Sequence, residues 1–179
     1  MPVTVSRLLD GIERPQDLHA LSEDELQQVA QEVREVIIDT VGEIGGHFGA
    51  NLGTCEPTVA LHSLLDSPTD KILWDVGHQA YPHKILTGRR AQIATIRKYA
   101  GLAPFCSPFG SEHTIRGAGH ASSSIGYAVG LKEAMRHGVG TPGRVAAVIG
   151  DGAMTGGVAF EAIHQAGGLG TPLVVVLND

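Results

Sequence analysis

The sequence is poor in cysteine and in aromatic residues, and it lacks a long apolar run. Its 179 residues include 2 cysteines and 4% aromatic residues. Cys55 and Cys106 are far apart and form no metal-type pair, so they favour a reducing compartment over a disulfide framework or a zinc site. No segment reaches the roughly 18 apolar residues of a membrane span, and Met1–Asp10 lacks the apolar core of a signal peptide. These absences predict a soluble, cytoplasmic protein.

Clusters of basic residues are also missing. The formal net charge is −6, without a Lys/Arg cluster, which argues against nucleic acid or an anionic membrane as partner. The hydrophobic fraction of 42% is enough for one domain with a sizeable core. The 24 glycines follow no repeat, so they indicate tight loops around a ligand. We see no internal repeat and no domain boundary, and we expect a single domain.

The first half of the chain alternates helical and extended patterns. Ser22-Glu23-Asp24-Glu25 is a capping box that opens a helix whose apolar residues recur at helical spacing up to Val41. The glycine-rich stretch 42–53 is expected to be irregular. Glu56-Pro57 is expected to open a second helix with Val59, Ala60 and Leu64 facing inward, and residues 71–74 to form a short strand.

The segments that follow are less regular. We predict a modest helix over 91–99 and a long loop rich in Gly, Pro and Ser over 100–118. Residues 122–136 are expected to form a helix with small residues on one side, among them Gly126 and Gly130. Small side chains there would allow the close approach of a neighbouring element or subunit.

The most informative pattern lies in the last third of the chain. An apolar run from Val145 ends in Gly150-Asp151-Gly152, a helix-like segment follows, and a second apolar run ends in Asn178-Asp179. This is a βαβ unit with polar residues at the carboxyl ends of its strands, where open α/β sheets bind ligands. We therefore predict an α/β fold with an open, mostly parallel sheet and helices on both faces.

Asp151 is a candidate metal ligand. Gly150 and Gly152 permit a tight turn beside it, and the helix start behind them offers free N–H groups and a positive dipole end. A carboxylate at such a place suits Mg²⁺, which takes oxygen ligands and usually binds substrate phosphates as well. Taken alone, the motif is equally compatible with a strand-to-helix turn that Asp151 caps.

The nine histidines show no metal-binding spacing such as His-Glu-x-x-His. Four of them are expected on the surface or satisfied within the fold: His19, His62, His137 and His164. His47, His78 and His120 differ because each follows a glycine in a loop. Those three are candidate site residues.

Four blocks of sequence carry a family resemblance. Residues 45–53, 74–89, 117–122 and 148–157 resemble, in the same order, motifs of the 1-deoxy-D-xylulose-5-phosphate synthase family. Members of that family are transketolase-like enzymes that use thiamine diphosphate. They catalyse the first step of non-mevalonate isoprenoid synthesis, which also supplies thiamine and pyridoxal precursors.

The resemblance implies a cofactor site, a metal and a reaction. Asp151 would bind Mg²⁺, and His47 would take part in substrate binding or proton transfer. The cofactor-binding residues would be His78, Gly119, His120, Ala121, Gly152 and Ala153. The reaction would be the decarboxylative condensation of pyruvate with D-glyceraldehyde 3-phosphate, carried out by a homodimer in the full-length form.

The chain also departs from the family pattern. The metal-binding Asn of the family is the second in an Asn-Asp-Asn run, so Asn178 corresponds to the first and the expected ligand would follow Asp179. Ala121 stands where many relatives have Ser, and Thr114 where Asp is common. The pyrimidine-binding and carboxyl-terminal domains are absent. Residues 1–179 are thus expected to be one incomplete diphosphate-binding domain, cut after a strand and inactive alone.

Two alternatives remain at this point. The chain could be half of a split transketolase-type enzyme that uses another ketol donor, or a non-catalytic remnant that serves as an interaction module. The block 75–84 favours the synthase over the other transketolase-type enzymes.

Overall fold

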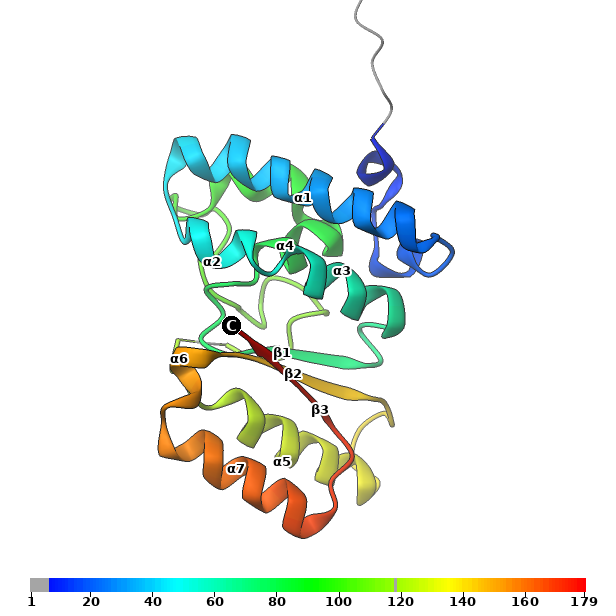
Figure 1. The fold of residues 1–179 in the computed structure, drawn as a ribbon, viewed down its shortest axis with the longest axis vertical. Coiled ribbons are helices and arrows are strands. Elements are labelled where there is room, and N and C mark those ends of the chain that lie inside the picture. Colours follow the sequence, from blue (N-terminus) through cyan, green and yellow to red (C-terminus); the bar gives the residue numbers. More distant parts are fainter. Residues whose placement is uncertain (1–6, 118) are drawn as a thin grey trace, which may run out of the picture. The chain divides into compact units, whose positions relative to one another are not determined.

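The computed structural model describes residues 7–117 and 119–179, which form two compact units (Figure 1). The first unit comprises the chain up to Asp66 together with Tyr81–Leu102. The second comprises Ser67–Ala80 and Ala103–Asp179. In the described part of the chain, no helix is long and apolar enough to cross a membrane.

The first unit is built from helices. Its main helix is α1 (Glu23–Ile44), followed by α2 (Phe48–Leu52), α3 (Cys55–Leu64) and α4 (Tyr81–Lys84). Short 3₁₀ or π turns complete it at Leu8–Gly11, Pro15–Leu18, Ile85–Arg89 and Arg90–Thr95. Their apolar faces meet in one core, with Val33, Ile37 and Tyr81 fully buried.

The predicted capping box opens α1 as expected. The Glu25 carboxylate accepts from the Ser22 backbone N–H at 2.8 Å, and the Ser22 hydroxyl accepts from the Glu25 backbone N–H at 3.4 Å. The predicted irregular stretch 42–53 is wrong in part, because α1 runs on to Ile44 and residues 48–52 form α2. Packing around the buried Asn51 outweighs the flexibility of the local glycines.

The predicted inward face of α3 is also wrong in part. Ala60 is exposed and Leu64 is 68% exposed, whereas Val59 is buried as expected. The helix begins at Cys55, and its buried positions follow from that residue at helical spacing: Cys55, Thr58, Val59 and His62. The prediction considered only apolar residues, whereas the polar residues Thr58 and His62 also lie on the buried face.

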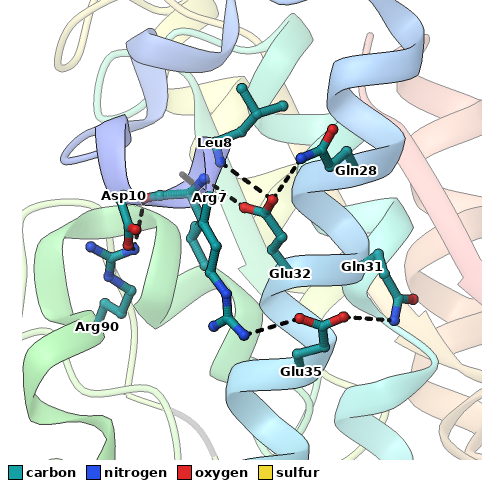
Figure 2. Close-up of polar contacts among 9 residues, drawn as sticks. Arg7, Leu8, Asp10, Gln28, Gln31, Glu32, Glu35 and Arg90 are labelled. Carbon is teal, nitrogen blue, oxygen red and sulfur yellow. Dashed lines mark hydrogen bonds and ion pairs between the residues drawn. The ribbon is translucent and has the colours of Figure 1, made fainter. Parts of the chain in front are cut away.

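One buried carboxylate ties the start of the described chain to α1 (Figure 2). Glu32 accepts hydrogen bonds from the backbone N–H groups of Leu8 at 3.3 Å and Leu9 at 2.8 Å. The side-chain amide of Gln28, one turn earlier in α1, donates to the same carboxylate at 2.8 Å. Arg90 holds the same turn from a second residue, since its Nη1 donates to the Leu9 carbonyl at 2.7 Å. The turn around Leu9 is therefore fixed by two charged side chains, Glu32 and Arg90.

The second unit contains the sheet. Strands β1 (Lys71–Trp74), β2 (Val145–Gly150) and β3 (Val174–Asn178) are all parallel, in the order β1-β2-β3. Residue Trp74 pairs with Val148, and Gly150 pairs with Asn178. This confirms the predicted α/β fold with an open parallel sheet.

Helices α5 (Ser124–Arg136) and α7 (Gly157–Leu169) lie on the same side of the three strands, and the short α6 (Asp151–Met154) directly follows β2 (Figure 1). Ile125, Ala128 and Ala159 form a core with the sheet. A Cβ at Gly126 would lie 3.8 Å from the Ala162 Cβ, an ordinary van der Waals distance, so α7 is the element next to this face of α5.

Two predicted helix boundaries need correction. Helix α5 begins at Ser124 rather than at residue 122, because Ser122 has a left-handed φ of 67° and therefore cannot continue a right-handed helix. The predicted helix 91–99 is only a 3₁₀ turn that ends at Thr95. The loop predicted over 100–118 is confirmed for 100–117, and Ala118 lies outside the described residues.

Candidate cofactor site at the carboxyl ends of the strands

Three chain segments that the sequence singled out leave the sheet of the second unit at one edge. Asp75–His78 follow β1, Asp151 follows β2, and Asn178 is the last residue of β3. The Asn178 amide donates to Gln79 Oε1 at 3.3 Å, which links the end of β3 to the loop after β1. The carboxyl edge of a parallel sheet is where such folds bind ligands.

Asp75 organises this edge, and sequence analysis did not identify it as a site residue. Its side chain is fully buried. Oδ1 accepts from the Ser122 backbone N–H and Oδ2 from the Ser124 backbone N–H, both at 2.8 Å. These charge-assisted bonds hold the loop that carries His120 and Ala121 against the end of β1. The only sequence signal was an acidic residue placed directly after an apolar strand.

Ser122 connects that loop to the Gly-Asp-Gly segment. Its hydroxyl donates to the Ala153 backbone carbonyl at 2.6 Å. A Cβ at Gly156 would lie 2.1 Å from the Ser122 hydroxyl oxygen, so glycine is required there. The structure therefore brings two predicted cofactor-binding segments together, 119–121 and 152–153.

The residues directly before Ser122 face solvent. Gly119, His120 and Ala121 are exposed, and Gly119 has a φ of 149° with open space where a Cβ would stand. The Ser123 hydroxyl donates to the His120 carbonyl at 3.0 Å and accepts from Arg116 Nη2 at 2.8 Å. The loop thus has a fixed backbone and an accessible surface.

Arg116 supports the loop from its other side. Its guanidinium carbon lies 3.8 Å from the centre of the Tyr127 ring, a cation–π arrangement. Sequence analysis missed this residue because nothing in the local pattern distinguishes it from a surface arginine. The stacked guanidinium fixes the Ser123 hydroxyl that holds the His120 carbonyl.

Asp151 is exposed and is the first residue of α6. Among residues 7–117 and 119–179, no group of three or more His, Cys, Asp or Glu side chains could hold a metal. Asp151 is therefore the one carboxylate that the sequence prediction offers as a metal ligand at this end of the sheet. Gly152 has nothing within 4 Å of its Cβ position, so the backbone beside Asp151 is open.

His78 sits at the end of a strained turn. Val76 has a φ of 58° and Gly77 a φ of 81°, and the Gly77 N–H donates to the Asp75 carbonyl at 2.5 Å. A β-branched residue with positive φ is unusual and costs conformational energy. The turn places the half-buried His78 at the carboxyl end of β1, as the sequence predicted.

His47 lies in the first unit, at the N-cap of α2. The Tyr81 hydroxyl oxygen is 3.4 Å from His47 Nδ1 and 3.4 Å from its backbone nitrogen. Asn51 donates to the His47 carbonyl at 2.5 Å and accepts from the Tyr81 backbone N–H at 2.8 Å. Tyr81 and Asn51 are fully buried and were not identified from the sequence.

The four histidines assigned to no site behave as expected. His62 is fully buried and stacks on His83, with 2.9 Å between His62 Nε2 and His83 Nδ1. His19 Nε2 lies 3.4 Å from the Leu65 carbonyl, and His137 and His164 are exposed. Each of the four is therefore either exposed or in contact with a polar group of the fold, so the number of histidines alone does not indicate a site.

Cys55 offers no reactive thiol to the first unit. Burial raises the pKa of the Cys55 thiol to about 12, although the nearby Arg34 guanidinium acts in the opposite direction. The reactive species of cysteine is the thiolate, and so high a pKa keeps the group protonated at neutral pH.

Comparison with known proteins finds similar sequences along nearly the whole chain. A family model described as 1-deoxy-D-xylulose-5-phosphate synthase matches residues 9–179. The 1-deoxy-D-xylulose-5-phosphate synthase of Anaeromyxobacter sp. is 56% identical over 175 residues, which are 98% of this chain and 27% of that protein. The synthase of Thermomicrobium roseum is 55% identical over 172 residues, covering 96% of this chain and 27% of its own length.

Solved structures show the same fold at low sequence identity. Transketolase from Leishmania mexicana aligns with a TM-score of 0.76 and 21% identity, over 85% of this chain and 27% of that chain. Transketolase from Campylobacter jejuni aligns with a TM-score of 0.73 and 19% identity, over 88% of this chain and 28% of that chain. The chain therefore spans about a quarter of the length of the proteins it matches.

Proposed function

Because the chain belongs to the 1-deoxy-D-xylulose-5-phosphate synthase family, we propose that it is the portion of such an enzyme that binds the diphosphate end of thiamine diphosphate. The complete enzyme condenses pyruvate with D-glyceraldehyde 3-phosphate, releases carbon dioxide and forms 1-deoxy-D-xylulose 5-phosphate. The groups that hold the pyrimidine end of the cofactor then lie outside these 179 residues, which make up one incomplete domain.

One observation carries the proposal. The Asp75 carboxylate and the Ser122 hydroxyl join the loop 119–121, the end of β1 and the segment 151–153 into one edge. Exposed glycines and backbone N–H groups next to a carboxylate are the elements that a magnesium diphosphate needs. The same residues fall in the blocks that resemble the family.

The residues of the second unit have separate roles in this proposal. Asp151 would bind Mg²⁺, which would hold the diphosphate. The residues that would contact the cofactor are His78, Gly119, His120, Ala121, Gly152 and Ala153. Bound thiamine diphosphate supplies the electron sink for the decarboxylation, and the chain supplies orientation and proton donors.

His47 takes part in substrate binding or proton transfer rather than in cofactor binding. An imidazole suits this task because its unperturbed pKa lies near physiological pH. The contacts of His47 with Tyr81 and Asn51 support the role, because Asn51 fixes the His47 backbone and the Tyr81 hydroxyl lies beside the ring nitrogen Nδ1. The full-length enzyme acts as a homodimer in this proposal.

A chimeric enzyme tests the function without isolating a part of it. These 179 residues would replace the matching segment of the Anaeromyxobacter synthase, and the formation of 1-deoxy-D-xylulose 5-phosphate would be measured. We expect activity, and we expect Asp151→Ala to abolish it while Asp39→Ala, an exposed acidic residue on α1, does not.

The alternatives have their own outcomes in this assay. An inactive chimera that still binds thiamine diphosphate would favour a transketolase-type enzyme with a different donor. An inactive chimera that binds neither cofactor nor Mg²⁺ would favour a non-catalytic remnant. Steady turnover by the 179-residue chain alone would refute the proposal that the site is incomplete.

A further inference from the structure

The Tyr81 hydroxyl group contacts His47 at two points. Its oxygen lies 3.4 Å from the His47 backbone nitrogen and 3.4 Å from ring nitrogen Nδ1. Tyr81 is fully buried, as the first residue of α4. A Cβ at Gly46 would approach the same hydroxyl oxygen to 3.2 Å, so the glycine before His47 allows the phenol this close to the backbone.

The two contacts differ in direction. The His47 backbone N–H can only donate, so the Tyr81 oxygen accepts there. The hydroxyl group also has one hydrogen of its own, and because Tyr81 is fully buried that hydrogen needs an acceptor within the protein. His47 Nδ1, 3.4 Å from the hydroxyl oxygen, is the acceptor that we assign to it. Nδ1 of His47 is therefore an acceptor.

Asn51 prevents the pair from separating. Its Oδ1 accepts from the Tyr81 backbone N–H at 2.8 Å, and its Nδ2 donates to the His47 carbonyl at 2.5 Å. One fully buried amide thus bonds the backbones of both partners. The two bonds together fix the His47 backbone beside the start of α4.

We propose that Tyr81 is a positioning residue that holds neutral His47 as the Nε2–H tautomer, so that His47 offers a bound substrate a hydrogen-bond donor rather than a lone pair. In a neutral imidazole one nitrogen donates and the other accepts, so fixing Nδ1 as the acceptor fixes Nε2 as the donor. An Nε2–H group recognises an acceptor such as a carbonyl, hydroxyl or phosphate oxygen.

This assignment deepens the proposed function, on which the substrate role of His47 rests, but the tautomer itself is independent of activity. Nitrogen-15 NMR of the imidazole distinguishes the two neutral tautomers directly in the 179-residue chain. At a pH where His47 is neutral, we expect Nε2 to be protonated. A predominantly protonated Nδ1 would overturn the proposal without any variant.

A matched pair of variants isolates the hydroxyl. Tyr81→Phe keeps the buried ring and removes only the oxygen, so it should convert His47 to a mixture of tautomers. Tyr99→Phe removes a hydroxyl from a fully exposed side chain of the same unit and should leave the ratio unchanged. An unaltered tautomer ratio in Tyr81→Phe would contradict a positioning role for Tyr81.

Activity in the chimera then separates this inference from the proposed function. Tyr81→Phe should lower kcat while the affinity for thiamine diphosphate stays the same. Loss of cofactor affinity in Tyr81→Phe would show that Tyr81 serves the fold rather than His47. An inactive parent chimera with the Nε2–H tautomer intact would refute the proposed function and leave the tautomer assignment standing.

Discussion

Glu32 in the first unit and Asp75 in the second make the same kind of contact, but they fix different segments. Each is a buried carboxylate that accepts hydrogen bonds from two backbone N–H groups distant in the sequence. Glu32 holds Leu8 and Leu9, a turn without candidate site residues. Asp75 holds Ser122 and Ser124, directly after His120 and Ala121. A buried carboxylate becomes functionally important through the segment it fixes.

The largest expected effect comes from removing these two carboxylates in turn. Asp75→Ala leaves two buried N–H groups unpaired, at about 1–3 kcal/mol each, so both stability and cofactor affinity should fall. Glu32→Ala should cost stability for the same reason but leave cofactor affinity unchanged. Urea unfolding and calorimetric titration with thiamine diphosphate and Mg²⁺ measure the two quantities.

Hydrogen exchange adds a local control to this pair. The amides of Ser122 and Ser124 should lose protection only in Asp75→Ala, and those of Leu8 and Leu9 only in Glu32→Ala. Equal loss of cofactor affinity in both variants would mean that the distinction between a structural and a functional carboxylate is wrong.

Replacing the histidines should give the next largest loss of activity, and it tests whether the two units have different roles. His47→Ala, in the first unit, should lower turnover of the chimera with cofactor affinity nearly intact. His78→Ala and His120→Ala, in the second, should weaken cofactor binding. Steady-state kinetics at varied cofactor concentration distinguish the two patterns. If all three variants showed the same kinetic pattern, the three histidines would not have separate roles.

A smaller effect is expected from Ser122, which combines a hydrogen bond with a left-handed backbone. Ser122→Ala loses the bond to the Ala153 carbonyl, a loss of about 1 kcal/mol. Ser122→Gly loses the same bond but removes left-handed strain of roughly 1–2 kcal/mol. Ser122→Gly should therefore be the more stable variant in urea unfolding. The reverse order would show that the serine conformation is not strained.

The smallest effect concerns pH and the capping box of α1. Backbone and side-chain hydrogen bonds from Ser22 lower the pKa of Glu25 below its usual value of 4.5. Because the folded-state pKa is the lower one, the contribution to stability is present above pH 4.5 and is lost as the pH falls through the folded-state pKa. Glu25→Gln should flatten the acid side of the stability profile slightly, as thermal unfolding at several pH values would measure.

Sequence patterns predicted the elements whose signals are local. The Ser22–Glu25 box, the strand at 71–74 and the apolar run from Val145 depend on neighbouring residues, and each forms as expected. The inward face of α3 could not be predicted from its apolar residues, because Thr58 and His62 are buried by partners elsewhere in the fold.

The residues of the candidate site also differ in whether a local sequence pattern marks them. His47, His78, His120 and Asp151 stand in glycine-containing motifs and could be named as candidates from the sequence. Asp75 and Tyr81 could not, because their importance comes from hydrogen bonds to Ser122 and to His47, which lie 47 and 34 positions away. Long-range contacts of this kind leave no local pattern.

The most direct test of the magnesium diphosphate site is paramagnetic broadening by Mn²⁺, a substitute for Mg²⁺, in the NMR spectrum of the 179-residue chain with thiamine diphosphate. We expect broadening centred on Gly150–Ala153 and extending to Gly119–Ala121, with a large reduction in Asp151→Asn. Broadening centred instead on the acidic start of α1, Glu23–Glu25, or unchanged in Asp151→Asn, would contradict the proposed magnesium site.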